Sequence, residues 1–257
     1  MTMHPTALLV VAGLFGLLLG SFLNVCIFRL PRGTSVVWPA SACGSCQREL
    51  RWFENIPVIS WLVLGAKCAR CKAPISLQYP IVEATTAVLF VLVTATTPLG
   101  PALAARLIFV AALVVLFAID LEHHLLPNVI TLPGIVVGLL FALLGPPGWQ
   151  ASLLGVLLGG GVLYAIAAGY YAVRKEEGMG MGDVKMLAMI GAFLGWQSVL
   201  LTLVLASLSG AVIGLALIVV QRGSMKHALP FGTFLALGAL VAMLAGQPVI
   251  DWYVGFY

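Results

Sequence analysis

Apolar segments long enough to span a membrane recur along this chain from residue 6 to residue 246, with one long polar stretch after the first of them. A helix needs about 20 mostly apolar residues to cross the hydrocarbon of a bilayer. The composition agrees, because 61% of the residues are hydrophobic and only 9% are charged, against about 25% charged in soluble domains. The sequence therefore predicts an all-α polytopic membrane protein with seven or eight transmembrane helices and one small inserted domain.

The expected spans divide the chain into three regions. These are a first transmembrane helix at 1–28, a cysteine-rich insertion at 29–80 and a second membrane domain at 81–257. The sixth span is short for a complete crossing, so it is either partly re-entrant or joined to the seventh as a tight hairpin. The eight spans are expected at residues 6–28, 81–97, 102–120, 129–145, 151–173, 184–197, 198–220 and 229–246.

Basic residues are distributed unevenly over the loops between these spans. Lys and Arg in short loops are retained on the cytoplasmic side, and only Arg106 among the 13 basic residues falls on the opposite side. This arrangement places the N-terminus outside and the insertion in the cytoplasm. The first span is expected to be an uncleaved anchor, since its positive charge follows it at Arg29 and Arg32. The orientation of the chain in the membrane is enough to explain its excess of basic residues, so we expect no nucleic-acid partner.

Four cysteines in the insertion form two C-x2-C pairs, as in structural zinc sites. Four thiolates satisfy a tetrahedral metal, and metal binding would stabilise a segment that is small for a core of its own. Disulfides are the main alternative, which the expected cytoplasmic location disfavours, and iron in place of zinc stays open. The fifth cysteine, Cys26, is expected to be a packing residue. The predicted metal ligands are Cys43, Cys46, Cys68 and Cys71.

Two acidic residues lie at the ends of apolar spans. Asp120 closes one span, and Asp183 follows a glycine-rich segment and opens another. Both are expected at the cytoplasmic edge, where two carboxyls that share a site hold one proton between them, as aspartic proteases require. Gly180 and Gly182 allow close approach of another helix or of a substrate backbone. Structural roles stay open, with Asp183 as a helix N-cap and Asp120 at the end of a span.

Short motifs follow one another in a fixed order along nearly the whole chain. They are GSFLN at 20–24, FRLP at 28–31, the two cysteine pairs, NIP at 55–57, SW at 60–61, YPIVE at 79–83, ID at 119–120 with Pro127, GMGDVK at 180–185 and PFG at 230–232. In order and spacing they resemble the type IV prepilin peptidase family of bacterial inner-membrane aspartic proteases.

The resemblance implies that Asp120 and Asp183 are the catalytic aspartates. The substrates would be type IV prepilins or secretion pseudopilins, whose basic leader is cut at the cytoplasmic face of the inner membrane, with the enzyme's N-terminus in the periplasm. Members with the cysteine-rich insertion typically also methylate the new N-terminal residue with S-adenosylmethionine, although the chain has no glycine-rich fingerprint for that cofactor. Glu83 is a second candidate, either as a contact for the leader or the methylation site or as a helix cap.

The chain departs from the family pattern at two positions. Asn128 and Thr233 stand where the family often has Asp and Pro, and His123 and His124 are expected in a solvated loop. The alternatives are a peptidase without methylation, a transporter with a proton-relay pair of aspartates, and a zinc-stabilised interaction module. A metalloprotease is disfavoured because H-E-x-x-H is absent. The oligomeric state is not predicted.

Overall fold

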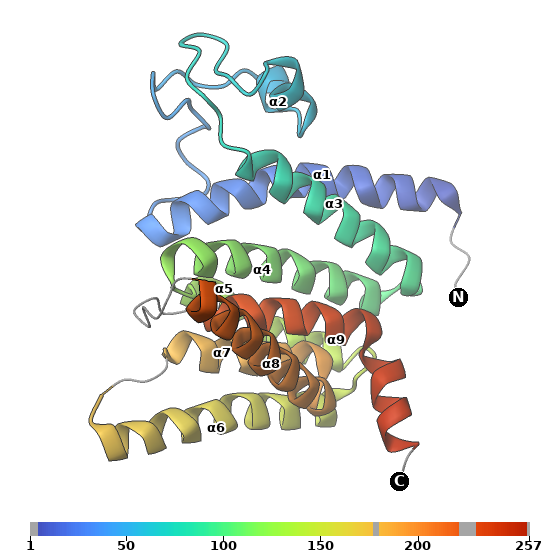
Figure 1. Ribbon diagram of the computed structural model, residues 1–257. Helices are drawn as coiled ribbons and strands as arrows, with labels where there is room; N and C mark the ends of the chain where they lie inside the picture. The colour runs from blue at the N-terminus through green and yellow to red at the C-terminus, as the bar shows by residue number, and fades with distance from the viewer. Residues whose placement is uncertain (1–4, 177–179, 221–229, 256–257) are drawn as a thin grey trace. The chain divides into compact units, whose positions relative to one another are not determined.

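The computed structural model describes residues 5–176, 180–220 and 230–255, and these residues form helices and loops with two isolated β-bridges (Figure 1). Three short helices belong to the insertion: η1 (Leu30–Arg32), η2 (Trp52–Asn55) and α2 (Ile59–Val63). The long helices are α1 (Thr6–Arg29), α3 (Gln78–Thr96), α4 (Pro101–His123), α5 (Asn128–Ala142), α6 (Trp149–Arg174), α7 (Met181–Leu194), α8 (Trp196–Val220) and α9 (Phe231–Val254). Each corresponds to one expected span, which confirms the predicted all-α membrane fold.

Six of these helices are long and apolar enough to cross a membrane, namely all but α5 and α7. Gly195 alone separates α7 from α8, with φ of 79°, a conformation that glycine adopts without steric cost. The boundaries differ most at α9, which was expected to end at 246 and continues to Val254 with Pro248 inside it. Of the basic loop residues, Arg222 and Lys226 lie outside the described residues.

The outward-facing side chains of the long helices are apolar. On α1, Val11, Leu14 and Leu18 are each more than half exposed, and Leu208, Val212 and Leu215 on α8 are equally accessible. Soluble monomers rarely expose continuous apolar faces of this size. The same faces are compatible with lipid, in which helices satisfy their own backbone hydrogen bonds.

The chain forms two compact units, Met1–Leu99 and Gly100–Tyr257. The first contains α1, the insertion and α3. Gly16 and Gly20 face α3, where a Cβ would lie 2.7 Å from the Cα of Ala87 and of Glu83 respectively. Small residues spaced by four let membrane helices approach closely. The separate boundaries expected at residues 28 and 80 stay a prediction.

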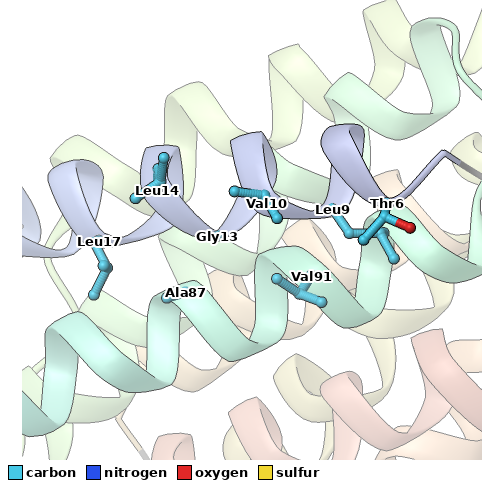
Figure 2. A pocket seen from close by; sticks show the side chains of 8 residues that line it. All are labelled: Thr6, Leu9, Val10, Gly13, Leu14, Leu17, Ala87 and Val91. Atoms are coloured by element: carbon cyan, nitrogen blue, oxygen red, sulfur yellow. The ribbon is translucent and has the colours of Figure 1, made fainter.

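A shallow groove runs between α1 and α3 (Figure 2). Its volume is about 380 Å³, and its lining includes Leu9, Val10, Leu14 and Val91. Almost all of its surface is apolar. It belongs to the same lipid-compatible exterior as the rest of α1.

In the second unit, α7 packs against α5, α6, α8 and α9. Its residues from Met186 to Phe193 are all buried. Contact with α6 depends on glycine: a Cβ on Gly155 would lie 2.5 Å from the Gly191 carbonyl oxygen, and one on Gly159 would lie 2.5 Å from that of Leu187. The position of α7, and therefore of Asp183 at its start, depends on this close contact.

We expect Gly155→Ala to push α6 and α7 apart, because the new methyl group meets backbone that cannot rotate away. The cost should be about 1–3 kcal/mol in stability, as for other overpacked sites. Thermal unfolding in detergent measures it. Gly161→Ala on the same helix is the matched control, since its Cβ meets nothing within 4 Å; equal stability of both variants would contradict the close-packing argument.

Candidate active site and metal centre

Asp120 lies on the last turn of α4 and is only 4% exposed. The helix ends at His124, whose φ of 52° is left-handed and whose N–H donates to the Asp120 carbonyl at 2.9 Å. This cap turns the chain back at once, so that Leu126 returns toward the end of the helix. His123 and His124 lie on this turn, and His124 is exposed, as expected for a solvated loop.

Asp183 lies on the first turn of α7. The N-cap position is held by Gly180, and no side chain caps this helix end, so the interpretation of Asp183 as the N-cap is wrong. The Asp183 side chain is partly buried, and Asp120 is close enough for the two charges to interact. The structure therefore brings the two predicted aspartates together.

Gly182 and Gly232 close the space around the pair, and Leu126 contacts both. A Cβ on Gly182 would lie 3.0 Å from the Leu126 Cβ, and one on Gly232 would lie 2.9 Å from Asp120 Oδ2. Gly180 is open, with Asp183 Oδ2 at 3.8 Å from its Cβ position. Gly182 thus packs against the turn between α4 and α5, whereas Gly180 leaves space beside Asp183 among the described residues.

The start of α9 completes the site. Asp120 Oδ2 accepts hydrogen bonds from the Thr233 N–H at 2.7 Å and from the Thr233 hydroxyl at 3.1 Å. The end of α4 and the beginnings of α7 and α9 lie at the same end of the helix bundle (Figure 1). A pair of carboxyls held in this way can exchange one proton with a bound water and a substrate carbonyl.

Asn128 begins α5 and accepts a hydrogen bond from Lys185 Nζ at 2.9 Å. This bond joins α5 to α7 one turn from Asp183. Asn128 stands where the family often has Asp, and its amide oxygen accepts the bond that links the two helices.

Glu83 is a buried acid of the first unit, 6% exposed, on α3. Its Oε2 accepts the Val58 N–H at 2.7 Å, and its side chain also interacts with Ser21. Val58 has φ of 60°, which is strained for a β-branched residue. Glu83 therefore does not cap α3; it holds a turn of the insertion against the helix pair.

A pocket of about 480 Å³ adjoins this acid in the same unit. One face of α1, including Ser21 and Phe22, forms one wall, and Val37, Pro39 and Asn55 contribute to the other. Arg29 also lines the pocket and donates to the carbonyls of Ser35 and Pro39 at 2.9 and 2.7 Å, which fixes the loop. Its volume lies within the range of small-molecule sites, and the pocket is open to the outside.

The four predicted metal ligands converge in the insertion. One sulfur from each lies within 4.8 Å of the other three, and the Sγ atoms of Cys43 and Cys71 are 3.7 Å apart. Sulfurs at the corners of a tetrahedral zinc site with bonds of about 2.3 Å are roughly 3.8 Å apart. None of the five cysteines, all within the described residues, forms a disulfide. The cluster therefore fits one tetrahedral ion.

The two C-x2-C loops have the same backbone geometry. The N–H of Cys43 donates to Arg48 and that of Cys68 to Ala73, and the residue after each second cysteine, Gln47 or Lys72, is left-handed. The N–H groups of Cys71 and Arg70 lower the pKa of the Cys68 thiol to about 6, and those of Cys46 and Ser45 lower the pKa of Cys43. The first cysteine of each loop is therefore held toward the thiolate form that binds metal, whereas burial and the neighbouring thiols raise the pKa of Cys71 to about 11.

An ion pair ties the first loop to the rest of the insertion. Arg48 donates to Glu54 at 2.6 Å, and this bond is the main reason that the pKa of Glu54 is lowered. Glu54 also accepts the Arg51 N–H at 2.8 Å at the start of η2. The metal loops are therefore connected to the short helices that Glu83 holds.

Sequence reasoning missed Thr233, Leu126 and the role of Gly232. The PFG motif was noted at 230–232, but nothing in the sequence indicates that the next residue bonds to an aspartate 113 positions earlier. The first backbone N–H groups of any helix have no partner within that helix, but which group they bond to depends on how the helices pack.

Comparison with known proteins gives two family matches. Residues 14–97 match the bacterial Peptidase A24 N-terminal domain, and residues 107–215 match the type IV leader peptidase family. No solved structure matches the chain.

Curated relatives cover nearly the full length. The chain is 38% identical to a prepilin leader peptidase/N-methyltransferase of Aeromonas hydrophila, over 94% of this chain and 92% of the relative. Proteins of the same name are 36% identical in Pseudomonas aeruginosa, over 98% and 96%, and 32% identical in Legionella pneumophila, over 99% and 97%. The chain belongs to the type IV leader peptidase family.

Proposed function

We propose that this protein cleaves the basic leader from type IV prepilins or pseudopilins and then methylates the new N-terminal residue. The observation that carries the peptidase activity is the convergence of Asp120 and Asp183 at one end of the second unit. One carboxylate takes a proton from the water that attacks the scissile carbonyl. The other, protonated, donates to the developing oxyanion, and the proton taken from water then passes to the leaving amine.

The site is proposed at the cytoplasmic face of the inner membrane, with the N-terminus in the periplasm. The end of α6, with Arg174 and Lys175, lies at the same end of the bundle as the start of α7 (Figure 1). Basic residues at this end favour the cytoplasmic side. A leader that enters from the cytoplasm would reach the aspartates without crossing hydrocarbon.

Replacing either aspartate with Asn should abolish leader cleavage, because Asn can neither accept nor deliver the proton. We expect a loss of roughly 100-fold or more, measured on a model prepilin with each purified variant. Asp251→Asn is the matched control, since Asp251 is exposed on α9 and bonds only to Gln247 in the described structure. Cleavage that survives in either folded variant would favour a proton relay or an interaction module.

For methylation, we propose that the pocket beside Glu83 holds S-adenosylmethionine, which supplies an electrophilic methyl group when bound. A buried carboxylate favours a cationic ligand, whether a sulfonium or the substrate amine. Ser21 lines the pocket and interacts with Glu83, which supports a role for this acid next to the pocket. Glu83 would orient the amine or withdraw its proton.

Glu83→Gln should leave leader cleavage intact and lower methylation about tenfold or more. The amide oxygen of Gln can still accept the Val58 N–H, so the turn should keep its shape while the charge is lost. Mass spectrometry of the mature substrate measures the two activities separately. The control is Glu49→Gln, on an exposed residue of the same insertion; unchanged methylation in both variants would remove Glu83 from the site.

We propose that the four cysteines bind a structural zinc ion. Purified protein should contain about one zinc per chain, and its removal should open the insertion to protease while cleavage of prepilin is not directly inhibited. Cys68→Ser should lose the metal, whereas Cys26→Ser on α1 should keep it. Immediate, reversible inhibition by a chelator with the insertion intact would argue instead for a catalytic metal.

A further inference from the structure

Among the described residues, the two aspartates differ in the hydrogen bonds that their side chains accept. Asp120 Oδ2 accepts two, both from Thr233, at 2.7 Å from the backbone N–H and 3.1 Å from the hydroxyl. Asp183 lies in the first turn of α7. Hydrogen bonds donated to a carboxylate favour its ionised form.

The position of Thr233 explains why these donors are available. Thr233 is the third residue of α9, and the first N–H groups of a helix have no partner within it. Asp120 satisfies one of them from another helix. The helix dipoles do not separate the two aspartates in favour of Asp120, which lies in the last turn of α4 whereas Asp183 lies in the first turn of α7. The difference is made by the direct hydrogen bonds from Thr233.

Other titratable groups of the described residues lie on the end of α4 and on the turn after it. His124 lies on that turn and is exposed. Glu122 and His123 lie on α4 itself, with His123 4.0 Å from Glu122.

The helices packed against the end of α4 contribute few further charges. The packed α5 carries none, α7 contributes Asp183 and Lys185, and the charged residue of α9 is Asp251 near its far end. Lys185 donates to Asn128.

We infer that Thr233 makes Asp120 the ionised member of the pair, which leaves the shared proton on Asp183. This assignment rests on the proposed peptidase function. Asp120 then takes the proton from the attacking water, and Asp183 donates its proton toward the carbonyl oxygen of the substrate. As the tetrahedral intermediate collapses, the proton held by Asp120 passes to the leaving amine, and Asp183 takes back a proton from one hydroxyl of the intermediate, so the pair again holds one proton.

The chain's departure from the family pattern makes the inference testable. Proline, the residue that the family often has at this position, has no N–H and no hydroxyl. Thr233→Pro therefore removes both donors, and proline is tolerated in the first turn of a helix. Thr233→Val removes the hydroxyl and keeps the N–H, and Thr233→Ser keeps both.

The experiment is the pH dependence of kcat/KM for prepilin cleavage by the full-length protein. Loss of donors raises the pKa of Asp120, so the acidic limb of the profile should move to higher pH. We expect a shift of about half a pH unit for Thr233→Val and about one unit for Thr233→Pro. Thr233→Ser should match the wild type.

The control is Thr202→Val, because Thr202 is fully buried in the same unit and its hydroxyl has no partner in the described structure.

Three outcomes would overturn the assignment. Movement of the alkaline limb alone would mean that Asp120 carries the proton. An unmoved profile in an active Thr233→Val variant would mean that the bonds do not set the protonation state, as would an equal shift in Thr202→Val. None of these touches the peptidase proposal, which fails only if the aspartate variants keep their activity.

Discussion

Every backbone polar group that faces hydrocarbon must find its partner within the chain, and this requirement decides where chemistry can occur in a protein of this kind. Helix interiors satisfy the requirement themselves, so unpaired donors and tolerated charges are restricted to helix ends. Asp120 at the end of α4, Asp183 at the start of α7 and Thr233 at the start of α9 all occupy such ends. The pair therefore lies at the edge of the bundle.

Glycine packing converts this general restriction into a defined site. Gly155 and Gly159 bring α6 against the backbone of α7, and Gly232 leaves room for Asp120 against the start of α9. Each contact is closer than a Cβ would allow. The aspartates thus meet because two helix pairs, α6 with α7 and α4 with α9, approach at glycine, and the same geometry places the Thr233 donors within bonding distance of Asp120.

Much of the fold follows from the sequence, because the length of each apolar segment can be read directly from consecutive residues. All eight long helices were expected, with the largest boundary error at α9, which continues past residue 246 to Val254 with Pro248 inside it. The cysteine cluster was also predictable, since C-x2-C pairs encode their own loop geometry. The aspartates were identified by their location at span ends, although the sequence did not exclude an N-cap role for Asp183, which the structure does.

The protonation state of the pair could not be predicted, because it depends on which helix start faces which carboxylate. A sequence shows that α9 begins near residue 230 but not that its free N–H groups point at Asp120. Thr233 is a departure from the proline that the family often has at this position. In the folded chain it supplies two donors that proline lacks. The proposed protonation state therefore depends on a residue whose partner is set only by the packing of α9 against α4.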